Sequence, residues 1–555
     1  MGLYLLDYGA GNVQSLANSL SKLGHSFTWI SAPEDFHKAT SLIFPGVGAF
    51  GTAIEYLTRK GLLEPLREYI QSGKPYFGIC IGMQVLFQSS SESPGFNGLG
   101  IVPAVIDRFD DSDKSVPHIG WNSAELVQTL NVESSYYYFV HSYCAKCSPN
   151  DQTDFAKWTY TATQYGQELF VSSVRRGNIF GTQFHPEKSG SAGLALIDDW
   201  LKKPEIEKSK QASQTQSAHL VKSKDNLTKR IIACMDVRTD DGGNLVVTKG
   251  DQYDVREKVS SSSPVQVQTG GAVRNLGKPV DLAFKYYAAG ADEICLLNIT
   301  SFRQSPLQDQ PMIAVVRAAA ERVFVPLTIG GGIKDTIDPD GTKHSALDVA
   351  SEYFRAGADK VSIGSDAVYA AEKLLGSGRS RGDGKSSIEM IALAYGNQAV
   401  VVSIDPRRIF VDASTYDGPH KDELVHGLTE SRDEGKSWWY ACTVSGGRET
   451  RSISACQLAR AVEALGAGEI LVNSIDRDGT GQGFDLDLLR LIKGNVKIPV
   501  VASSGAGKAE HFLEVFQETG VEAALAAGIF HREEVEIREV KEFLKSKDTK
   551  VRTSI

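Results

Sequence analysis

Short apolar runs alternate with longer amphipathic segments along most of this 555-residue chain. This alternation is typical of α/β folds, in which buried strands are joined by helices. In the second part of the chain the number of buried-strand candidates is eight, which fits a (β/α)8 barrel. These runs occupy residues 230–237, 292–299, 325–329, 359–363, 398–404, 468–474, 498–503 and 522–527.

One segment interrupts the alternation. Residues 202–226 (KKPEIEKSKQASQTQSAHLVKSKDN) are rich in Lys, Ser and Gln and contain no aromatic residue. Such a segment buries too little apolar surface to offset the entropy of ordering it. The pattern therefore predicts an N-terminal domain over residues 1–203 with an open α/β sheet, a linker over 204–227, and a barrel domain over 228–555.

The barrel domain also repeats itself. RIIACMDVR (230–238) is similar to VVVSIDPRR (400–408), and GADEICLLNI (290–299) is similar to GAGEILVNSI (466–475). PLTIGGGIK and PVVASSGAGK form a third such pair. Strands 1–4 and 5–8 therefore read as two copies of one half-barrel, which predicts a pseudo-twofold site. Polar insertions that we expect to be loops explain the large size of the barrel: residues 259–272, 334–345, 376–387 and 412–437.

Composition narrows the cellular setting. The net charge of −9 argues against a general nucleic-acid-binding surface, which needs a basic face. No apolar run is long enough for a membrane span, and the residues before Lys22 carry no basic charge of the kind found in signal or transit peptides. Seven scattered cysteines argue for a reducing compartment rather than a disulfide framework. We expect a cytoplasmic protein without membrane or nucleic-acid partners.

A candidate nucleophile lies in the segment YFGICIGMQVLF (76–87). Here Cys80 stands between Gly78 and Gly82, where a strand meets a helix-like run. Flanking glycines permit the sharp nucleophile-elbow turn, and a helix N-terminus favours a thiolate. A buried packing cysteine is the alternative, but the glycine frame favours the functional interpretation.

Two further segments offer a base and an oxyanion hole for this nucleophile. In IFGTQFHPEKSG (179–190), His185 and Glu187 are two residues apart, so Glu187 can orient the imidazole while His185 faces the thiol. In FPGVGAFG (44–51), the backbone amides around Val47 and Gly48 can join the Ile81 amide as an oxyanion hole. Either segment alone is a weak signal, because a solvated His–Glu pair or a tight turn is common.

Taken together, residues 1–201 resemble the class I glutamine amidotransferases. The resemblance implies Cys80 as nucleophile, His185 as base and Glu187 as its orienting carboxylate. It also implies glutamine hydrolysis to glutamate and ammonia through a glutamyl thioester. Glutamine-holding roles then fall on Gln84, His141, Ser142 and Tyr143. Cys144 and Cys147 form a lone CxxC without a second pair, so we expect no metal site.

In the barrel, two carboxylates occupy equivalent places in the repeat. Asp236 closes strand 1 and Asp405 closes strand 5, at the C-terminal end where barrel active sites lie. Strands 1 and 5 of eight stand opposite each other, so the pair suits general acid and base catalysis. Loop-capping aspartates are the alternative for either residue alone, and the repeat favours the catalytic interpretation.

Glycines close the neighbouring strands. Gly330–Gly332 follow strand 3 and Gly505–Gly507 follow strand 7, while Gly364-Ser365 and Gly528 follow strands 4 and 8. Loops after strands 7 and 8 often bind phosphate through backbone amides. The duplicate set predicts a substrate with a phosphate at each end. The segment GDGKSS (382–387) lacks the first glycine of a P-loop, so we expect neither an ATP site nor a cofactor.

Residues 228–552 closely resemble the cyclase of the imidazole glycerol phosphate synthase family, and the fused arrangement resembles its bifunctional form. The motifs that carry the likeness are ACMDVR, VVTKGDQYDV, LTIGGGIKD, GADKVSIG, SIDRDGTGQG and ASSGAGK. The resemblance implies a TIM barrel that uses ammonia and a ribulosyl formimino-aminoimidazole carboxamide ribonucleotide, a bisphosphate. Its products would be imidazole glycerol phosphate and an aminoimidazole carboxamide ribotide of histidine biosynthesis. Both activities would then lie in one chain and need no partner subunit.

The same resemblance assigns binding roles in the barrel. Asp236 and Asp405 become the acid–base pair. The pocket would be lined by Lys249, Ser445 and Asn473, with one phosphate near Asp478, Gly479, Gly505 and Gly528 and the other near Gly332, Gly364 and Ser365. Two rival interpretations remain: a glutamine-dependent synthase with a different phosphorylated acceptor, and a metabolite-binding scaffold with relict sites.

Four charged residues stand at strand starts, at the end of the barrel opposite its mouth. Arg230, Glu293, Lys360 and Glu469 begin strands 1, 2, 4 and 6. Two cations and two anions there can close a neutral ring around the barrel axis. The resemblance makes this ring a gate to an ammonia channel from the N-terminal domain; a purely structural ion-pair plug is the alternative.

Overall fold

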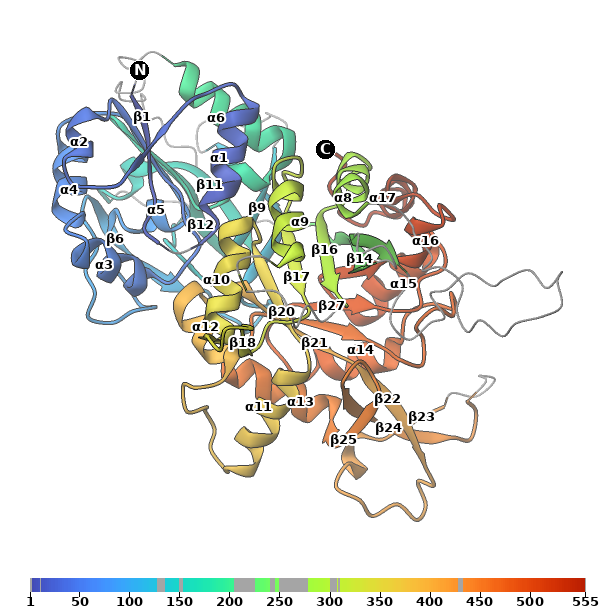
Figure 1. The fold of residues 1–555 in the computed structure, drawn as a ribbon. Coiled ribbons are helices and arrows are strands. Elements are labelled where there is room, and N and C mark those ends of the chain that lie inside the picture. The colour runs from blue at the N-terminus through green and yellow to red at the C-terminus, as the bar shows by residue number, and fades with distance from the viewer. Residues whose placement is uncertain are drawn as a thin grey trace.

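The computed structural model describes residues 2–9, 11–126, 135–148, 153–203, 225–239, 245–248, 278–299, 307, 310–427 and 433–554. Figure 1 shows two bodies side by side, an N-terminal domain in blue to cyan and a C-terminal barrel in green to red. Of the predicted linker, only the last three residues, 225–227, are among the described residues. Lys249 and the insertion 259–272 lie outside them.

The N-terminal domain is built on an eight-stranded sheet, β2-β1-β3-β4-β13-β12-β11-β8. Its first five strands run parallel and the last three run antiparallel. In sheet order they are Thr28–Ile30, Leu3–Leu6, Ser41–Phe44, Tyr76–Ile79, Ile179–Thr182, Glu168–Arg176, Thr159–Tyr165 and Glu125–Leu126. The helices are α1 (Val13–Lys22), α2 (Asp35–Lys38), α3 (Phe50–Arg59), α4 (Leu63–Gln71), α5 (Ile81–Gln84) and α6 (Gly190–Lys202), with 3-10 turns η1 (Ala156–Trp158) and η2 (Pro186–Lys188).

Two smaller sheets complete this domain. One pairs β7 (His118–Ser123) with β9 (Tyr136–His141), and the other has the order β10-β6-β5 (Tyr143–Cys144, Val102–Arg108 and Phe87–Ser90). The β7–β9 pair faces the barrel, because Trp121 and Tyr138 belong to the hydrophobic cluster that also contains the barrel's outer core. The β7–β9 pair therefore packs into the barrel's apolar cluster, while the rest of the N-terminal domain has clusters of its own.

The C-terminal domain is a closed eight-stranded parallel barrel, as predicted. The last strand pairs with the first through Arg230–Ala233 and Ala523–Ala526. In order the strands are β14 (Arg230–Thr239), β16 (Glu293–Asn298), β17 (Leu327–Gly330), β20 (Lys360–Ile363), β21 (Val400–Ile404), β26 (Glu469–Asn473), β27 (Val500–Ser503) and β28 (Ala523–Ala526). All eight coincide with the predicted apolar runs. Strand β15 (Leu245–Thr248) pairs antiparallel with β14 outside the barrel.

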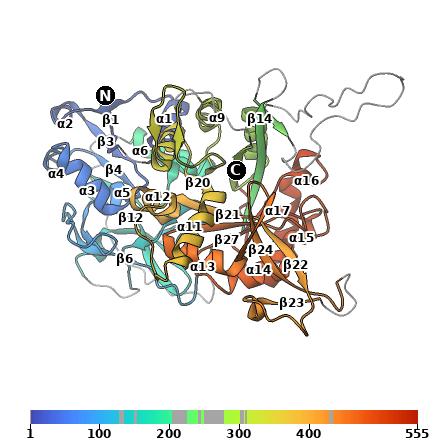
Figure 2. The same cartoon turned by 60° about the horizontal axis from the view of Figure 1, so that its bottom comes forward.

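Helices surround the barrel, as the rotated view in Figure 2 shows. They are α8 (Pro279–Ala288), α9 (Pro311–Ala320), α10 (Ala346–Ala356), α11 (Ser365–Gly376), α12 (Ser387–Tyr395), α13 (Ala455–Leu465), α14 (Leu486–Lys493), α15 (Ala509–Thr519), α16 (Gly528–His531) and α17 (Ile537–Ser546). Outward strand residues pack under these helices, while a separate cluster of alternate residues fills the barrel interior. Among the described residues, no helix is long and apolar enough to cross a bilayer.

The insertions differ in part from the expected loops. After β21 the chain forms an antiparallel sheet of β22 (Pro406–Val411), β24 (Ser437–Val444), β23 (Val425–His426) and β25 (Glu449–Ser454), with the 3-10 turn η5 (Lys421–Glu423) nearby. Residues 334–345 likewise contain a hairpin, β18 (Thr336–Ile337) with β19 (Lys343–His344). The larger sheet is stabilised by Arg408, which stacks 4.3 Å from the Trp438 ring and pairs with Asp485 and Asp433.

Candidate functional sites

Cys80 occupies the predicted elbow between β4 and α5. Its backbone has φ 51° and ψ −104°, a strained conformation for a residue with a side chain. The turn is tight because a Cβ on Gly82 would lie 1.9 Å from the Phe44 carbonyl oxygen, so only glycine fits there. Strain of this kind persists where the surrounding structure over-determines it, which is typical of active sites.

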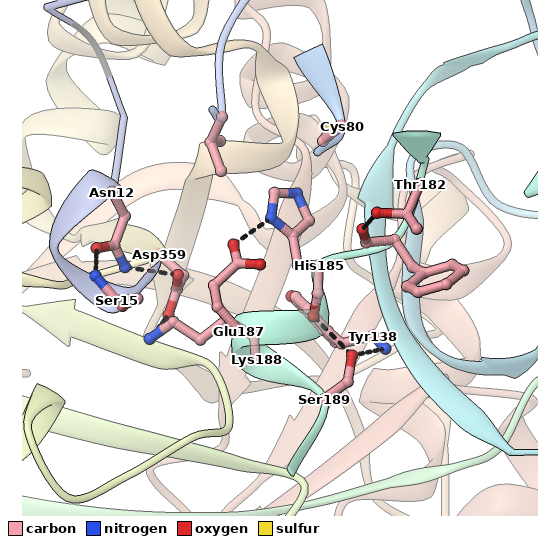
Figure 3. Close-up of polar contacts among 12 residues, drawn as sticks. Asn12, Ser15, Cys80, Tyr138, Thr182, His185, Glu187, Lys188, Ser189 and Asp359 are labelled. Carbon is pink, nitrogen blue, oxygen red and sulfur yellow. Dashed lines mark hydrogen bonds and ion pairs between the residues drawn. The ribbon is translucent and has the colours of Figure 1, made fainter. Parts of the chain in front are cut away.

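His185 and Glu187 form a buried pair beside this thiol (Figure 3). Nδ1 of His185 lies 2.8 Å from the Glu187 carboxylate, and both side chains are almost fully buried. Burial alone would lower the pKa of His185, but the charges of Glu187 and Cys80 outweigh it and raise that pKa well above its usual value. Because Nδ1 donates to Glu187, Nε2 is the atom left to exchange a proton with Cys80.

Gln183 is a contact of the nucleophile that the sequence analysis missed. Its Nε2 donates to Cys80 Sγ at 3.5 Å, and its Oε1 accepts from Gln84 Nε2 at 3.0 Å. Gln84 also donates to the Tyr143 carbonyl oxygen at 3.1 Å. Gln84 and Tyr143, both assigned to glutamine holding, are therefore connected to the thiol through Gln183. The signal available in sequence was position: Gln183 stands two residues before the base.

The predicted oxyanion turn lies next to the elbow. The Ile81 amide, one of its expected donors, points to the Gly46 carbonyl oxygen at 3.4 Å. The Val47 carbonyl oxygen accepts from the Tyr8 hydroxyl at 2.6 Å. An oxyanion bound at Ile81 must therefore replace the Gly46 carbonyl. Gly48 follows in the same turn, where a Cβ would meet the Tyr8 hydroxyl at 2.4 Å.

Glu92 is a second residue that the sequence analysis missed. Its carboxylate accepts from the Phe50 amide at 2.7 Å, at the start of α3. Burial raises the pKa of Glu92 to about 7 despite this hydrogen bond. Its charge contributes to the raised pKa values of Tyr8 and Tyr143, two residues near the elbow and the glutamine-holding segment. A carboxylate here suits the ammonium group of an amino-acid substrate.

His141 and Ser142 contact protein rather than open space. His141 Nε2 lies 3.2 Å from Nδ1 of His118, and its Nδ1 lies 2.9 Å from the Tyr143 carbonyl oxygen. The Ser142 carbonyl oxygen accepts from the Phe109 amide at 3.1 Å. Ser142 and His141 therefore shape the wall behind Gln84.

A polar contact joins the two domains directly behind the His185–Glu187 pair. Asn12 donates to Asp359 Oδ1 at 2.9 Å and to the Gly357 carbonyl oxygen at 2.8 Å, while Lys188 forms an ion pair with Asp359 at 2.8 Å. Figure 3 shows this group from three elements around one barrel carboxylate. The chain thus presents His185, just before the short η2 turn, to Cys80, and Lys188, the last residue of the turn, to the barrel.

The four strand-start charges form a closed ring in the barrel floor. Arg230 lies 2.8 Å from Glu293 and also pairs with Glu469. Lys360 lies 2.8 Å from Glu293 and 2.6 Å from Glu469. All four side chains are buried. Tyr138 connects this floor with the nucleophile: its carbonyl oxygen accepts from the His185 amide at 2.9 Å, and the charges of Glu293, Arg230 and Glu469 act on its phenol.

At the other end of the barrel a cavity of about 370 Å³ opens. It collects residues from the ends of strands 1, 6, 7 and 8, five of which were predicted: Asp236, Asp478, Gly479, Gly505 and Gly528. The glycines and Ser503–Gly507 give the cavity a wall rich in backbone amides, and Arg532 and His531 add side chains. Such a wall suits a phosphate group.

Asp405 lies in the barrel mouth on strand 5 but is not among the residues that line this cavity. Asn473 donates to its Oδ1 at 2.9 Å, and Thr443 donates to its backbone oxygen at 2.7 Å. Burial raises the pKa of Asp405, the Asn473 hydrogen bond opposes this, and Asp478 adds to it. A carboxyl group that keeps its proton longer than usual suits a general acid.

The second predicted phosphate set lies outside that cavity. The Ser445 amide donates to Ser365 Oγ at 2.9 Å, so these two predicted residues do meet. Open space surrounds the positions where Gly332 and Gly364 would carry a Cβ. Lys249, the remaining predicted pocket residue, lies outside the described residues. No cluster of three or more His, Cys, Asp or Glu side chains arranged for a metal occurs in the described part of the chain.

Comparison with known proteins agrees with this division. Residues 4–203 match the family described as glutamine amidotransferase class-I, and residues 230–536 match that described as histidine biosynthesis protein. An Emericella nidulans protein named imidazole glycerol phosphate synthase hisHF is 51% identical, covering 99% of this chain and 98% of its own. Its Schizosaccharomyces pombe namesake is 50% identical over 99% of each chain. The Haloarcula marismortui imidazole glycerol phosphate synthase subunit HisF is 38% identical and covers 59% of this chain, 99% of its own.

Fold and site together define a class I glutamine amidotransferase joined to a barrel of the histidine-biosynthesis type. Both halves are present in one chain, and full-length relatives share that arrangement. The chain belongs to the imidazole glycerol phosphate synthase family, in its fused hisHF form.

Proposed function

We propose that this chain hydrolyses glutamine in its N-terminal domain and passes the ammonia through the barrel floor to a bisphosphate nucleotide in the barrel mouth. The reaction would convert the formimino-aminoimidazole carboxamide ribulosyl nucleotide into imidazole glycerol phosphate and aminoimidazole carboxamide ribotide. The observation that carries the proposal is the continuity through Tyr138, whose backbone contacts His185 and whose side chain lies beside the buried charge ring.

The first half-reaction uses Cys80, His185 and Glu187. Nε2 of His185 takes the thiol proton, and Sγ of Cys80 attacks the carboxamide carbon of glutamine. The carbonyl oxygen becomes an oxyanion, which the Ile81 amide stabilises once the Gly46 carbonyl is displaced. His185 then gives that proton to the amide nitrogen, the C–N bond breaks and neutral ammonia leaves; water hydrolyses the thioester to glutamate and frees the Cys80 thiol.

The ammonia leaves toward the barrel. The site lies against the domain interface, and the ring of Arg230, Glu293, Lys360 and Glu469 closes the barrel axis there. We assign the ring the role of a gate that opens when one ion pair separates. Beyond it the interior is lined by an apolar cluster that includes Ile232, Leu471 and Val501, which favours neutral ammonia over ammonium.

In the barrel mouth the aspartates act on the nucleotide. Asp236 and Asp405 serve as the acid–base pair across the barrel axis, with Asn473 orienting Asp405. Backbone amides near Gly505 and Gly528 hold one phosphate, and those near Gly332 and Gly364 hold the other. This arrangement is consistent with a substrate that spans the mouth.

An assay pair tests this division of labour. Cys80→Ala should abolish synthesis from glutamine yet leave synthesis from added ammonium, while Asp236→Asn should abolish both. Mass spectrometry of the products checks the acceptor. If Cys80→Ala left the glutamine reaction intact, the nucleophile assignment would be wrong. If the intact enzyme made a different phosphorylated product, the assignment of the acceptor would be wrong.

We propose the cytoplasm as the compartment. All seven cysteines are free thiols in the structure, which is consistent with a reducing environment. Fractionation of cells that produce the protein checks this location directly.

A further inference from the structure

Two buried histidines of the N-terminal domain, outside the Cys80–His185–Glu187 group, are linked in a chain of hydrogen bonds. His118 on β7 and His141 on β9 are register partners across the strand pair. Asn122 Nδ2 lies 3.3 Å from His118 Nε2, and His118 Nδ1 lies 3.2 Å from His141 Nε2. His141 Nδ1 lies 2.9 Å from the Tyr143 carbonyl oxygen.

The chain continues to the nucleophile. The Tyr143 carbonyl oxygen also accepts from Gln84 Nε2 at 3.1 Å, and the second hydrogen of that amide goes to Gln183 Oε1 at 3.0 Å. Gln183 Nε2 donates to Cys80 Sγ at 3.5 Å.

The upstream end fixes where the protons lie. Asn122 Oδ1 accepts from the Ser123 amide at 2.9 Å, and its Nδ2 donates to the Gln164 carbonyl oxygen at 3.0 Å. The amide cannot flip without losing both bonds. Nε2 of His118 therefore faces a donor and must accept, which puts the proton of a neutral His118 on Nδ1.

The downstream end of the chain independently fixes the proton of His141 on Nδ1. The Tyr143 carbonyl oxygen can only accept, so His141 must carry its proton on Nδ1. Its Nε2 is then an acceptor, facing the Nδ1 proton of His118. With both rings neutral, every donor meets an acceptor. An added proton on His141 would place two donors face to face.

The surroundings keep both rings neutral. His118 is fully buried and His141 nearly so, among Phe109, Phe139 and Phe170. Burial, chiefly, lowers the pKa of His118 well below its usual value and that of His141 to about 3. The titratable groups that act on the two rings are His141 and Lys114 on His118, and His185 on His141, where the hydrogen bond to the Tyr143 backbone opposes the effect of burial.

We propose that His118 and His141 are positioning residues for glutamine hydrolysis: a neutral hydrogen-bond relay in which His141 and Gln84 both donate to the Tyr143 carbonyl oxygen, and which holds Gln84 and Gln183 against the Cys80 sulfur. The relay determines how Gln183 donates to that sulfur, and so how readily the thiolate forms and is aimed. It needs both imidazoles in the Nδ1–H form. In this role neither histidine gains or loses a proton during catalysis.

The relay begins on the strand that contacts the barrel. Trp121, next to Asn122, donates its indole N–H to the Asp292 carbonyl oxygen at 3.1 Å, and its own carbonyl oxygen accepts from the Thr228 amide at 2.9 Å. The upstream end is therefore held by the domain interface, and the downstream end by the nucleophile.

A matched pair of variants in the full-length enzyme tests the relay. His118→Phe keeps a ring in the aromatic surroundings but removes both nitrogens. His118→Asn keeps a neutral donor close to the place of Nδ1. We expect His118→Phe to lower kcat for glutamine hydrolysis about tenfold with little change in KM, and His118→Asn to stay within about threefold of the parent. Synthesis from ammonium should be unchanged in both.

Thiol reactivity gives a readout that overall packing does not move. The rate at which iodoacetamide alkylates Cys80, followed by peptide mass spectrometry at several pH values, should fall in His118→Phe and recover in His118→Asn. Equal impairment of both variants would overturn the relay, since then the donor hydrogen would not matter. So would a His118→Phe enzyme as active as the parent.

A double-mutant cycle with the far end of the chain separates a relay from independent contacts. Gln183→Met removes the donor to Cys80 and should slow hydrolysis by about tenfold alone. Combined with His118→Phe it should slow hydrolysis no more than the stronger single change, because both break one chain. Additive effects would contradict the proposal. If His118→Phe fails to fold, Gln183→Met and His118→Asn decide: normal Cys80 alkylation in the former, or slow alkylation in the latter, overturns it.

Discussion

The two reaction sites of this chain are built from different materials. Around Cys80 the parts are side chains, buried and joined to one another: His185 to Glu187, and Gln183 to the sulfur. In the barrel mouth the wall is largely backbone, with glycines and serines after strands 7 and 8 around an open cavity. The first site needs fixed proton positions, whereas the second must admit a large anion. Substitutions around Cys80 should therefore act on chemistry, and substitutions in the glycine-rich wall of the barrel mouth on binding.

The largest effect should come from Glu187→Gln. Glu187 and Cys80 together outweigh burial and raise the pKa of His185, so loss of the carboxylate lowers that pKa and weakens the imidazolium that accompanies the thiolate. We expect kcat for glutamine hydrolysis to fall on the order of 10²- to 10³-fold, with ammonium-dependent synthesis unchanged. Steady-state assays with each nitrogen source measure both. An equal loss of ammonium-dependent synthesis would contradict the prediction, because the substitution would then not act on the glutaminase site alone.

The same substitution has a signed pH signature. Because the folded pKa of His185 is raised, the ion pair stabilises the protein fully below about pH 6.5, the ordinary histidine pKa, and less as pH rises through the folded value. Thermal unfolding should therefore show a larger destabilisation by Glu187→Gln at pH 6 than at pH 9. The reverse order would mean that His185 is neutral in the native enzyme.

An intermediate effect should follow Lys360→Met, at the boundary between the two regions. It leaves Glu293 and Glu469 with one cation, which in a buried network costs about 3–5 kcal/mol. If the ring is a gate, product formed per glutamine hydrolysed should also fall about tenfold. Denaturant unfolding and paired glutamate and product assays measure these quantities.

Lys373→Met is the matched control, because it breaks an exposed ion pair with Asp383 and should leave the unfolding midpoint nearly unchanged. A Lys360→Met enzyme that loses stability but keeps full coupling would show the ring to be a structural plug.

The smallest effect should be that of Gly505→Ala in the barrel mouth. Gly505 has φ +97°, and a Cβ would lie 2.2 Å from the Gly483 carbonyl oxygen. The loop must shift, so we expect KM for the nucleotide to rise roughly fivefold with glutamine hydrolysis in the absence of nucleotide unchanged. Gly520→Ala is the control, with φ +73° and open space around its Cβ. A rise in KM in both variants would point to general loss of stability.

Much of the barrel could be predicted because its strands are buried on both faces and appear as continuous apolar runs. The aspartates and glycines at their ends followed from chain position alone. The sheet that contains β24 could not be predicted, and part of it was expected as a loop. The buried Trp438 of β24 packs against Arg408, and the position of Arg408 depends on the folded chain.

Cys80, His185 and Glu187 were predictable because they lie in two short local patterns. Gln183, Glu92 and the Asn12–Lys188–Asp359 contact were not, since each depends on segments that meet only in three dimensions. His141 was assigned to glutamine holding, a role that stays a prediction, and its pairing with His118 came from the strand register.

The charge ring places a limit on how symmetric this barrel can be. Glu293 and Glu469 begin strands 2 and 6 and are counterparts in the two halves of the repeat. The cations have no such counterparts: Arg230 begins strand 1 where Val400 begins strand 5, and Lys360 begins strand 4 where Ala523 begins strand 8.

Identical halves would bury four cations against two carboxylates in one floor, an excess of positive charge without solvent. A barrel that arose by doubling a half-length ancestor could therefore retain its duplicated phosphate loops at the mouth. At the base the two halves must differ, because two glutamates neutralise only one set of cations.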